Sequence, residues 1–349
     1  MNLVIGCSAA MLLATIIPPL RPAAQTIAVG KTPIALAVNP ATNKIYVVNH
    51  GDNSVSIIDG VTHAVKTLSV EDRPEAVAVN SLTNRAYVTN SGADSVSVID
   101  GATDTLSATV HVGSYPQALA INTVTNKIYV ANNFDHSVTV IDGATNATST
   151  IQVGQGPRGI ALNPVTNKVY TVNYGSQNVT VIDGATGTTT SVATGKHCWA
   201  IAVDARADKI YAVNEDTASV TIIQGATNAT TTVGVGPLPF AVEVNSTANK
   251  AYVLSYGNDT LAVIDGKTSV VSRTVDLGTH PQAIAVDEKT GQVYVANQRT
   301  ATVSVIDGTT DVVTRKVDVG MIPYAIAIDS AKHLVYVSNY SSNDVTVIP

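Results

Sequence analysis

Apolar and polar residues alternate in short runs from residue 25 to the end of the chain. One stretch contains four such runs of six or seven residues each, "EAVAVN", "RAYVTN", "SVSVID" and "LSATVHV". Runs that alternate with a period of two and are rich in Val, Ile, Thr and Tyr predict half-buried strands. Turn-forming segments separate them, "SLTN", "SGAD" and "GATD". Because no helical period is sustained beyond the apolar N-terminal segment, we expect an all-β protein.

The four-strand pattern repeats along the chain. A Tyr returns every 41 or 42 residues, at Tyr46, Tyr87, Tyr129, Tyr170, Tyr211, Tyr252, Tyr294 and Tyr336. A Pro returns in the same register, at Pro33, Pro74, Pro116, Pro157, Pro239, Pro281 and Pro323, and Cys198 stands where the eighth Pro would be. A period of about 40 to 45 residues is typical of a four-stranded propeller blade. The spacing therefore predicts eight blades.

The two ends of the repeat array complement each other. The last copy stops after its third strand, at "DVTVIP", and the array begins with an isolated fourth-strand pattern, "QTIAVG". An N-terminal strand that pairs with the last blade leaves no sheet unfinished. We therefore predict one domain, residues 25–349, folded as a closed β-propeller of eight four-stranded blades in which the N-terminal strand completes the last blade.

The second strands carry a recognisable signature. Residues 87–90 read "YVTN", and the equivalent segments read "YVVN", "YVAN", "YTVN", "YAVN", "YVLS", "YVAN" and "YVSN". Over residues 25–349 the chain resembles the YVTN-type β-propeller family of exported bacterial and archaeal proteins. That resemblance implies a propeller, usually with seven blades, whereas this sequence supports eight. It also implies export or surface display, and it implies no single reaction.

The N-terminal segment is typical of an export signal. Residues 3–20 are apolar throughout, and "PAA" at 22–24 offers a small-residue cleavage site. We predict a cleaved signal peptide over residues 1–24 and a periplasmic, extracellular or cell-surface location. No Lys or Arg precedes the apolar run, so an uncleaved anchor remains an alternative. Pro18 and Pro19 argue against a continuous spanning helix, and we expect no integral membrane domain.

Charge argues against a nucleic-acid partner, and the cysteine content argues against an intrachain disulfide. Charged residues make up 13% of the chain, the net charge is −6, and no cluster of Lys and Arg stands out. A nucleic-acid partner is therefore not expected. Cleavage of the leader would remove Cys7 and leave Cys198 as a lone thiol, which excludes an intrachain disulfide. We expect a monomer.

One face of the predicted disc varies from blade to blade. The first-to-second and third-to-fourth turns, "NPATNK" and "DGATN", barely change, whereas the second-to-third loops do, as in "NHGDNS", "NNFDHS" and "NYGSQN". Loops that vary on a rigid scaffold usually carry binding functions. The residue after each Pro position should lie on this variable face near the channel mouth: Ile34, Glu75, Gln117, Arg158, Trp199, Phe240, Gln282 and Tyr324. Its aromatic members either plug the mouth or contact a ligand.

The spacing of His and Cys residues gives little support for a metal site or a reactive thiol. Four His fall on the variable face, His50, His136, His197 and His280, but they come from different blades and no HxH, HxxH or CxxC spacing occurs. We predict no metal site and no cofactor, and no CxxCH haem-attachment motif is present. Cys198 follows His197 in a segment expected to be extended, so the two side chains should point apart. We interpret Cys198 as a small apolar substitute for Pro. The recurring Tyr, Asn and Asp are interpreted as structural.

Two functions remain open. The first is a non-enzymatic exported propeller that binds a protein, glycan or small molecule, with Trp199, Phe240, Tyr324, Gln117 and Gln282 as ligand contacts. The alternative is a hydrolase or lyase resembling the lactonase-type propellers, acting at the channel mouth. Its candidate catalytic residues are Glu75, Arg158, His197 and His280. There, a carboxylate and a His could act as acid and base, and Arg158 could hold an anionic substrate.

Overall fold

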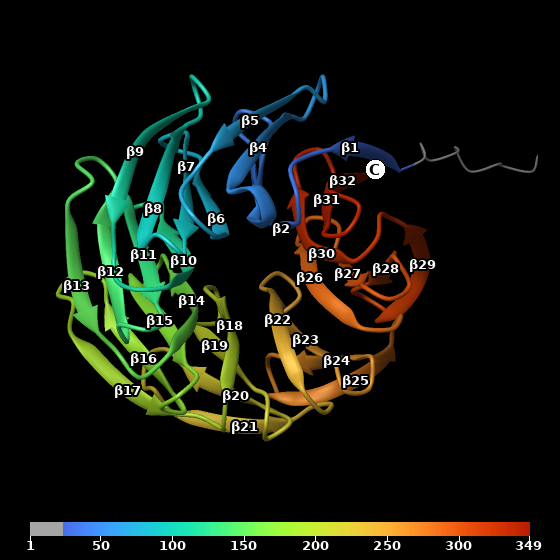
Figure 1. Ribbon diagram of the computed structural model, residues 1–349. Coiled ribbons are helices and arrows are strands. Elements are labelled where there is room, and N and C mark those ends of the chain that lie inside the picture. The colour runs from blue at the N-terminus through green and yellow to red at the C-terminus, as the bar shows by residue number, and fades with distance from the viewer. Residues whose placement is uncertain (1–23) are drawn as a thin grey trace, which may run out of the picture.

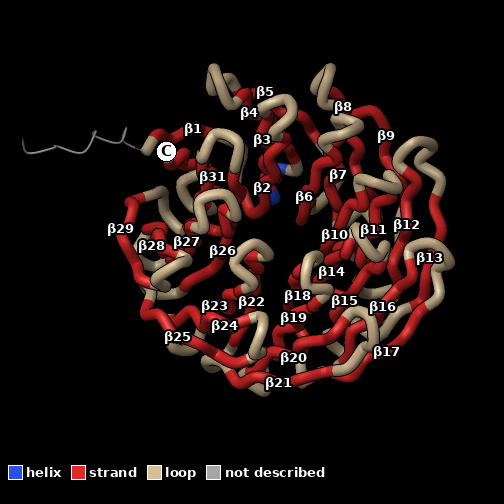
Figure 2. The backbone as a smooth tube through the Cα atoms, turned by 180° about the vertical axis from the view of Figure 1, so that it is seen from behind, coloured by secondary structure: helices blue, strands red, loops and turns tan. Residues whose placement is uncertain are grey.

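The computed structural model describes residues 24–349 as eight four-stranded antiparallel sheets set around a central axis (Figure 1). The all-β, eight-bladed prediction is confirmed. Strands make up nearly all of the ring, and the one helical element of the described part is the short 3-10 turn η1 (His50–Asp52), beside the innermost strand of the first blade (Figure 2). The predicted signal peptide lies outside the described residues, apart from Ala24.

Each blade runs from the axis outward in chain order. The innermost strands are β2 (Pro33–Asn39), β6 (Pro74–Asn80), β10 (Pro116–Asn122), β14 (Pro157–Asn163), β18 (Cys198–Asp204), β22 (Pro239–Asn245), β26 (Pro281–Asp287) and β30 (Pro323–Asp329). The second strands are β3 (Lys44–Asn49), β7 (Arg85–Asn90), β11 (Lys127–Asn132), β15 (Lys168–Asn173), β19 (Lys209–Asn214), β23 (Lys250–Ser255), β27 (Gln292–Asn297) and β31 (Leu334–Asn339).

The outer half of each blade continues the same order. The third strands are β4 (Ser54–Asp59), β8 (Ser95–Asp100), β12 (Ser137–Asp142), β16 (Asn178–Asp183), β20 (Ser219–Gln224), β24 (Thr260–Asp265), β28 (Thr302–Asp307) and β32 (Asp344–Ile348). The outermost strands are β5 (Val65–Ser69), β9 (Thr105–His111), β13 (Thr148–Gln152), β17 (Thr189–Ala193), β21 (Thr230–Gly234), β25 (Val270–Asp276), β29 (Val312–Asp318) and, in the last blade, β1 (Gln25–Ala28).

The last blade joins the two ends of the propeller. Strand β1 pairs antiparallel with β32, from Gln25 opposite Val347 to Ala28 opposite Asp344. Ile27, 6% exposed, is the one buried residue of β1, and it belongs to the same core cluster as Val345 and Val347. The prediction that the N-terminal strand completes the last blade is confirmed.

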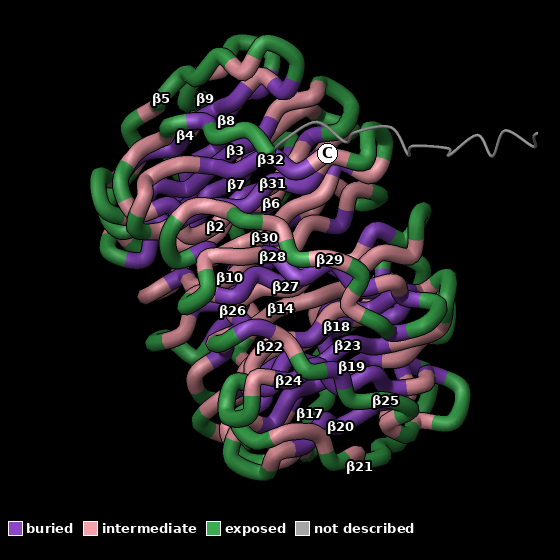
Figure 3. Tube along the Cα trace, turned by 90° about the vertical axis from the view of Figure 1, so that its right-hand side faces the viewer, coloured by how far each residue is buried: buried purple, intermediate pink, exposed green. Residues whose placement is uncertain are grey.

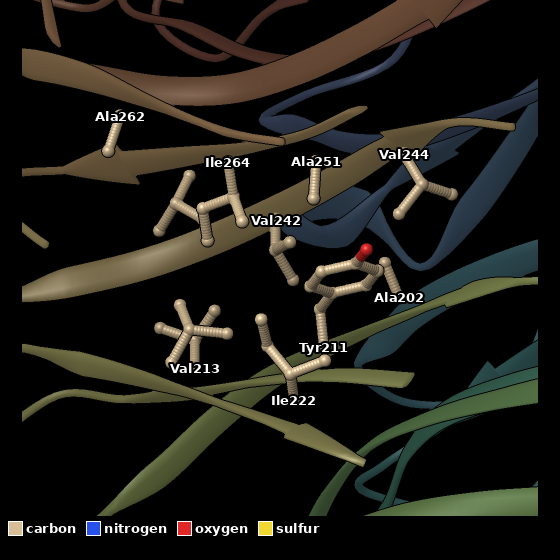
Figure 4. Packing of buried hydrophobic residues seen from close by; sticks show 11 residues of the cluster. Ala202, Tyr211, Val213, Ile222, Val242, Val244, Ala251, Ala262 and Ile264 are labelled. Atoms are coloured by element: carbon tan, nitrogen blue, oxygen red, sulfur yellow. The ribbon is translucent and has the colours of Figure 1, made fainter. Parts of the chain in front are cut away.

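The recurring Tyr fills the interface between neighbouring blades. Tyr211 on β19 is 1% exposed and packs in one cluster with Ala251 and Ile264 of the next blade (Figure 4). The equivalent Tyr of every blade does the same, so eight clusters of this kind run around the ring. Burial is accordingly concentrated in the strands, and exposure in the turns and outer edges (Figure 3).

Polar side chains of the uniform turns also link blade to blade. Lys44 Nζ donates to the carbonyl oxygen of Gly101, 2.8 Å away in the next blade, and Asn39 Nδ2 donates to Asn84 Oδ1 at 2.8 Å. Within a turn, Asp59 Oδ1 accepts the backbone N–H groups of the residues two and three positions on. Related bonds recur in most blades. The Asn that ends the second strand is structural too, because Asn49 Nδ2 donates to the hydroxyls of Ser54 at 3.0 Å and Ser56 at 2.9 Å. The structural interpretation of the recurring Tyr, Asn and Asp is thus confirmed, and the links between the uniform turns explain why their face varies so little.

We predict that Ile27→Ala destabilises the whole propeller. Removing a buried Ile side chain typically costs about 2 to 5 kcal/mol, and Ile27 is the buried contact that β1 makes at the closure. The free energy of unfolding, measured by urea denaturation, should fall by about 2 to 4 kcal/mol. Thr26→Ala, at an exposed position of the same strand, is the control and should change it by less than about 0.5 kcal/mol. Equal stability of both variants would show that closure contributes little.

Candidate functional site

In every blade, a β-bulge leaves the residue after the Pro position without a partner in the strand pairing. The pairing register shifts there, for example between Pro157 and Gly159 in the fourth blade, so Arg158 has no partner in the ladder. A bulge re-aims the unpaired side chain. The residue before the Pro position is left-handed in every blade, as at Tyr115 with a φ of 57°. The chain therefore turns sharply onto the inner strand and presents one side chain at the channel mouth.

These side chains line a cavity of about 500 Å³. Six of the eight predicted ring residues take part: Gln117, Arg158, Trp199, Phe240, Gln282 and Tyr324. The next two positions of the inner strands complete the lining with small and aliphatic residues, such as Ala200 and Ile201. Ile34 and Glu75 do not line it. The cavity is thus aromatic and polar at its rim and apolar below.

Arg158 is held flat against the single Trp of the chain. Its Cζ lies 3.3 Å from the centre of the Trp199 ring and 5.7 Å from that of Tyr174. The Tyr174 ring meets Trp199 edge-on at 5.8 Å and stacks on His197 at 4.3 Å, with 7° between the planes. His197 Nδ1 in turn lies 2.8 Å from Asp216 Oδ2. Cation–π contact and ring stacking together fix the guanidinium.

The Arg158 charge has no direct counterion. Within residues 24–349, no carboxylate lies within ion-pair distance of its guanidinium, and the guanidinium donates no hydrogen bond. Burial lowers the pKa of Arg158, and Glu215 opposes that shift from a distance. An arginine nevertheless remains protonated in proteins. The cavity therefore contains a partly desolvated positive charge.

Tyrosines of the second-to-third loops extend the aromatic surface. Phe240 meets Tyr256 edge-on at 6.1 Å, and the Tyr256 hydroxyl lies 2.9 Å from His280 Nδ1. Tyr324 stacks on Tyr340 at 5.8 Å, and burial raises the pKa of Tyr324. The repeat pattern did not predict that these loop tyrosines would take part. Their signal was a Tyr directly after the second strand in three of the variable loops, at Tyr174, Tyr256 and Tyr340.

The four candidate catalytic residues are not joined to one another. Glu75 Oε1 accepts a hydrogen bond from the hydroxyl of Ser91, 3.2 Å away. His197 pairs with Asp216, and His280, bonded to Tyr256, lines a separate pocket of about 400 Å³. Only Arg158 lines the cavity at the channel mouth. Among the described residues, no hydrogen bond or ion pair links any two of the four.

Cys198 takes the place of the Pro in burial and in its pairing with the second strand. It pairs with Asn214 at the bulge, as Pro157 pairs with Asn173, and it is 0% exposed. Burial raises the pKa of its thiol to about 12, so the thiolate needed for nucleophilic chemistry does not form at neutral pH. One expectation was wrong: His197 is left-handed, with a φ of 52°, and not extended, because the chain must turn there onto the inner strand.

Residues 24–349 contain neither a cluster of metal ligands nor a membrane-spanning helix. Across residues 24–349, no group of three or more His, Cys, Asp and Glu side chains comes close enough together to hold a metal ion. In the same part of the chain, no helix has the length and apolar character needed to cross a membrane.

The apolar–polar pattern did not predict one partly buried acid, Glu243. Glu243 lies at the fifth position of β22, where the other seven innermost strands have Ala. Burial, and to a lesser degree the Glu288 carboxylate, raises the pKa of Glu243 to about 7. The signal was a single acid in an otherwise constant Ala position.

Comparison with known proteins supports the fold alone. No protein-family model matches the chain, and no curated protein matches it. Among solved structures, hydrazine synthase of Kuenenia stuttgartiensis is similar, with 19% identity and a TM-score of 0.65, over 97% of this chain and 99% of that one. Dihydro-heme d1 dehydrogenase NirN, in complex with DHE, is similar with 11% identity and a TM-score of 0.76, over 95% of this chain and 78% of that one. These similarities support the propeller fold of the chain. Membership of the YVTN-type family stays a prediction.

We predict that Cys198 is inert in the folded protein. The chain from residue 24 onward, treated with Ellman's reagent at pH 8, should release almost no chromophore until denaturant is added, and then one equivalent. The raised pKa keeps the thiol protonated at that pH, and burial blocks access. Rapid reaction of the native protein would contradict the interpretation of Cys198 as a packing residue.

We predict that Glu243 makes stability depend on pH. Because its folded pKa of about 7 lies above that of an unfolded Glu, its contribution is fully present below about pH 4.3 and is lost as the pH rises through 7. Glu243→Gln should therefore raise the melting temperature at pH 8 and flatten its change between pH 5 and 8. The exposed Glu71→Gln serves as the control. A pH profile unchanged by Glu243→Gln would show that this carboxyl is well solvated.

Proposed function

We propose that this protein is an exported propeller that binds a ligand or partner through its variable face, without catalysis, and that the cavity at the channel mouth is the binding site. The observation that carries the proposal is the cavity itself, whose rim combines three aromatic rings, two amides and one positive charge. Concave sites with apolar walls and a few polar groups are the usual form of a ligand pocket.

The surface around the cavity suits a partner as well. Phe134 is 63% exposed and stacks on Tyr115, and Met321 is 60% exposed. Both residues belong to the variable loops and links. Exposed apolar side chains of this kind are available to contact a protein or glycan, and the opposite face carries them as well, at Leu82 and Val165. The export signal pattern and the YVTN-like repeats support a location outside the cytoplasm, and we include both in the proposal.

The enzyme alternative has one favourable observation. The His197–Asp216 pair, at 2.8 Å, is an arrangement in which a carboxylate orients a His for acid–base work. Against it, the His197 ring is covered on one face by Tyr174, and His197 does not line the cavity. The structural relatives include proteins named as a synthase and a dehydrogenase. Different activities on one fold give no reason to choose a lactonase-like reaction here.

We predict that Trp199→Ala removes binding and largely spares the fold. In a thermal-shift screen of sugars, lactones and organic acids, compounds that raise the melting temperature of the unaltered protein should fail to do so with the variant. Trp199 is only partly buried, so the variant alone should unfold within a few degrees of the unaltered protein. Val165→Ala, 80% exposed on the opposite face, is the control. A screen without any shift, together with a large loss of stability in Trp199→Ala, would show that the aromatic residues only plug the mouth.

We also predict no hydrolysis of simple lactones. A pH-stat assay with γ- and δ-lactones should give the same rate with the protein as with its Trp199→Ala variant and with buffer. Turnover that is lost in His197→Ala would instead establish the alternative function.

A further inference from the structure

We propose that the cavity selects organic monocarboxylates that carry a ring, and that Arg158, stacked on Trp199, holds the carboxylate. This inference rests on the proposed function, because it takes the cavity to be a binding site, and it adds the chemical class of the ligand. Four observations carry it: the geometry of Arg158, its missing counterion, the charge balance around it and the other walls of the cavity.

The first observation is that the Arg158 guanidinium lies on Trp199 and exposes its N–H edge to the cavity. Arg158 Cζ lies only 3.3 Å from the centre of the Trp199 ring, so the planar group has room only if it lies over the face of the indole. A guanidinium in that position keeps its N–H donors in its own plane, pointing sideways and away from the ring. Two parallel N–H groups match the two oxygens of a carboxylate. The stack therefore fixes a pair of N–H donors for a carboxylate and reduces the entropy lost when a ligand binds.

The charge is also unsatisfied. Arg158 has neither a carboxylate nor a hydrogen-bond partner among the described residues, although it is partly buried. His197 of the next blade, by contrast, is paired with Asp216 at 2.8 Å. A desolvated charge without a partner is costly, and an anionic ligand would offset that cost.

The charge balance favours one negative charge over two. Arg158 is the single Lys or Arg among the residues that line the cavity. The negative fields of Glu215 and Glu75 reach the mouth, since Glu215 acts on Arg158 and Glu75 on Tyr324. A carboxylate would balance the single cation, whereas a phosphate dianion would leave an excess negative charge near two acids.

The other residues that line the cavity favour a ligand that contains a ring. Phe240 and Tyr324 present aromatic surface to the cavity, and the strands below supply Ala and Ile side chains. The amide oxygen of Gln117 is buried without a hydrogen-bond partner in the described part of the chain, and Gln282 adds a second amide. Alicyclic acids and sugar acids fit this combination of flat apolar walls and amide groups.

Trp199 reports binding directly, because it is the only Trp of the chain. The fluorescence of the full protein would be titrated with cyclohexanecarboxylate and with glucuronate, and in parallel with their neutral counterparts, cyclohexanecarboxamide and glucose. Sulfate and phosphate form a third series at equal ionic strength. We expect a saturable change with at least one carboxylate, and binding at least about tenfold weaker for its neutral counterpart.

Variants separate the charge from the fold. Arg158→Gln should weaken carboxylate binding at least about tenfold, and Arg158→Lys, which keeps the charge but loses the planar fork, should fall between. Arg73→Gln, with an exposed side chain on the same face, is the matched control and should bind as the unaltered protein does. Circular dichroism and the melting temperature check the fold of each variant.

Several outcomes would overturn the inference. Equal binding of carboxylates and their neutral counterparts, or unchanged affinity in Arg158→Gln, would remove the carboxylate role and leave the cavity as a site for neutral ligands. Preference for phosphate or sulfate would assign the cavity to another class of anion. If carboxylates leave the fluorescence of Trp199 unchanged while sugars or lactones raise the melting temperature, the carboxylate class fails and the proposed function stands; if nothing binds, both fail.

Discussion

The fold depends on the contact between one blade's Tyr and the next blade's sheet. A single four-stranded blade has two apolar faces, and only its neighbours can cover them. Tyr211 shows the arrangement: its ring lies between its own β-sheet and Ala251 and Ile264 of the following blade. In a linear array the first and last blades would each expose such a face. The ring removes both, because Tyr336 of the last blade packs on Ile45 of the first.

The same constraint explains why the two faces of the disc differ. The turns of one face carry the polar links between blades, such as Lys44 to Gly101, so their sequence is held nearly constant. At the closing blades, where Gln292 and Leu334 replace the Lys, other contacts appear, including His333 with Asp287 at 3.2 Å. The loops of the opposite face also bond to the link into the next blade, but different side chains do so in different blades, such as Asn53 for the N–H of Arg73 and His136 for that of Gly156. They can vary without loss of the ring, which is why the cavity and its aromatic rim lie there.

The sequence was a good guide to everything that follows from periodicity. The spacing of Tyr46 and its equivalents predicted the number of blades, and the ring of residues after the Pro position predicted six side chains of the cavity. The sequence did not predict features that depend on one backbone angle or on one neighbouring side chain. The left-handed turn at His197 and the unusual setting of Glu243 come from local geometry and burial, which a pattern of apolar and polar residues does not encode. The alternation also could not show that Tyr174 would meet Trp199 edge-on.

The link into the fifth blade shows how a site can arise on such a scaffold. Cys198 is buried and paired as the Pro residues are, so the substitution keeps the packing. The pairing then skips to Ile201, which leaves Trp199 free of the ladder, as at the other bulges of the ring. Trp199 can therefore reach sideways to Arg158 of the preceding blade. Since each bulge presents one side chain that the strand pairing does not use, the composition of the channel mouth can change one blade at a time while the ring of tyrosines continues to hold the fold.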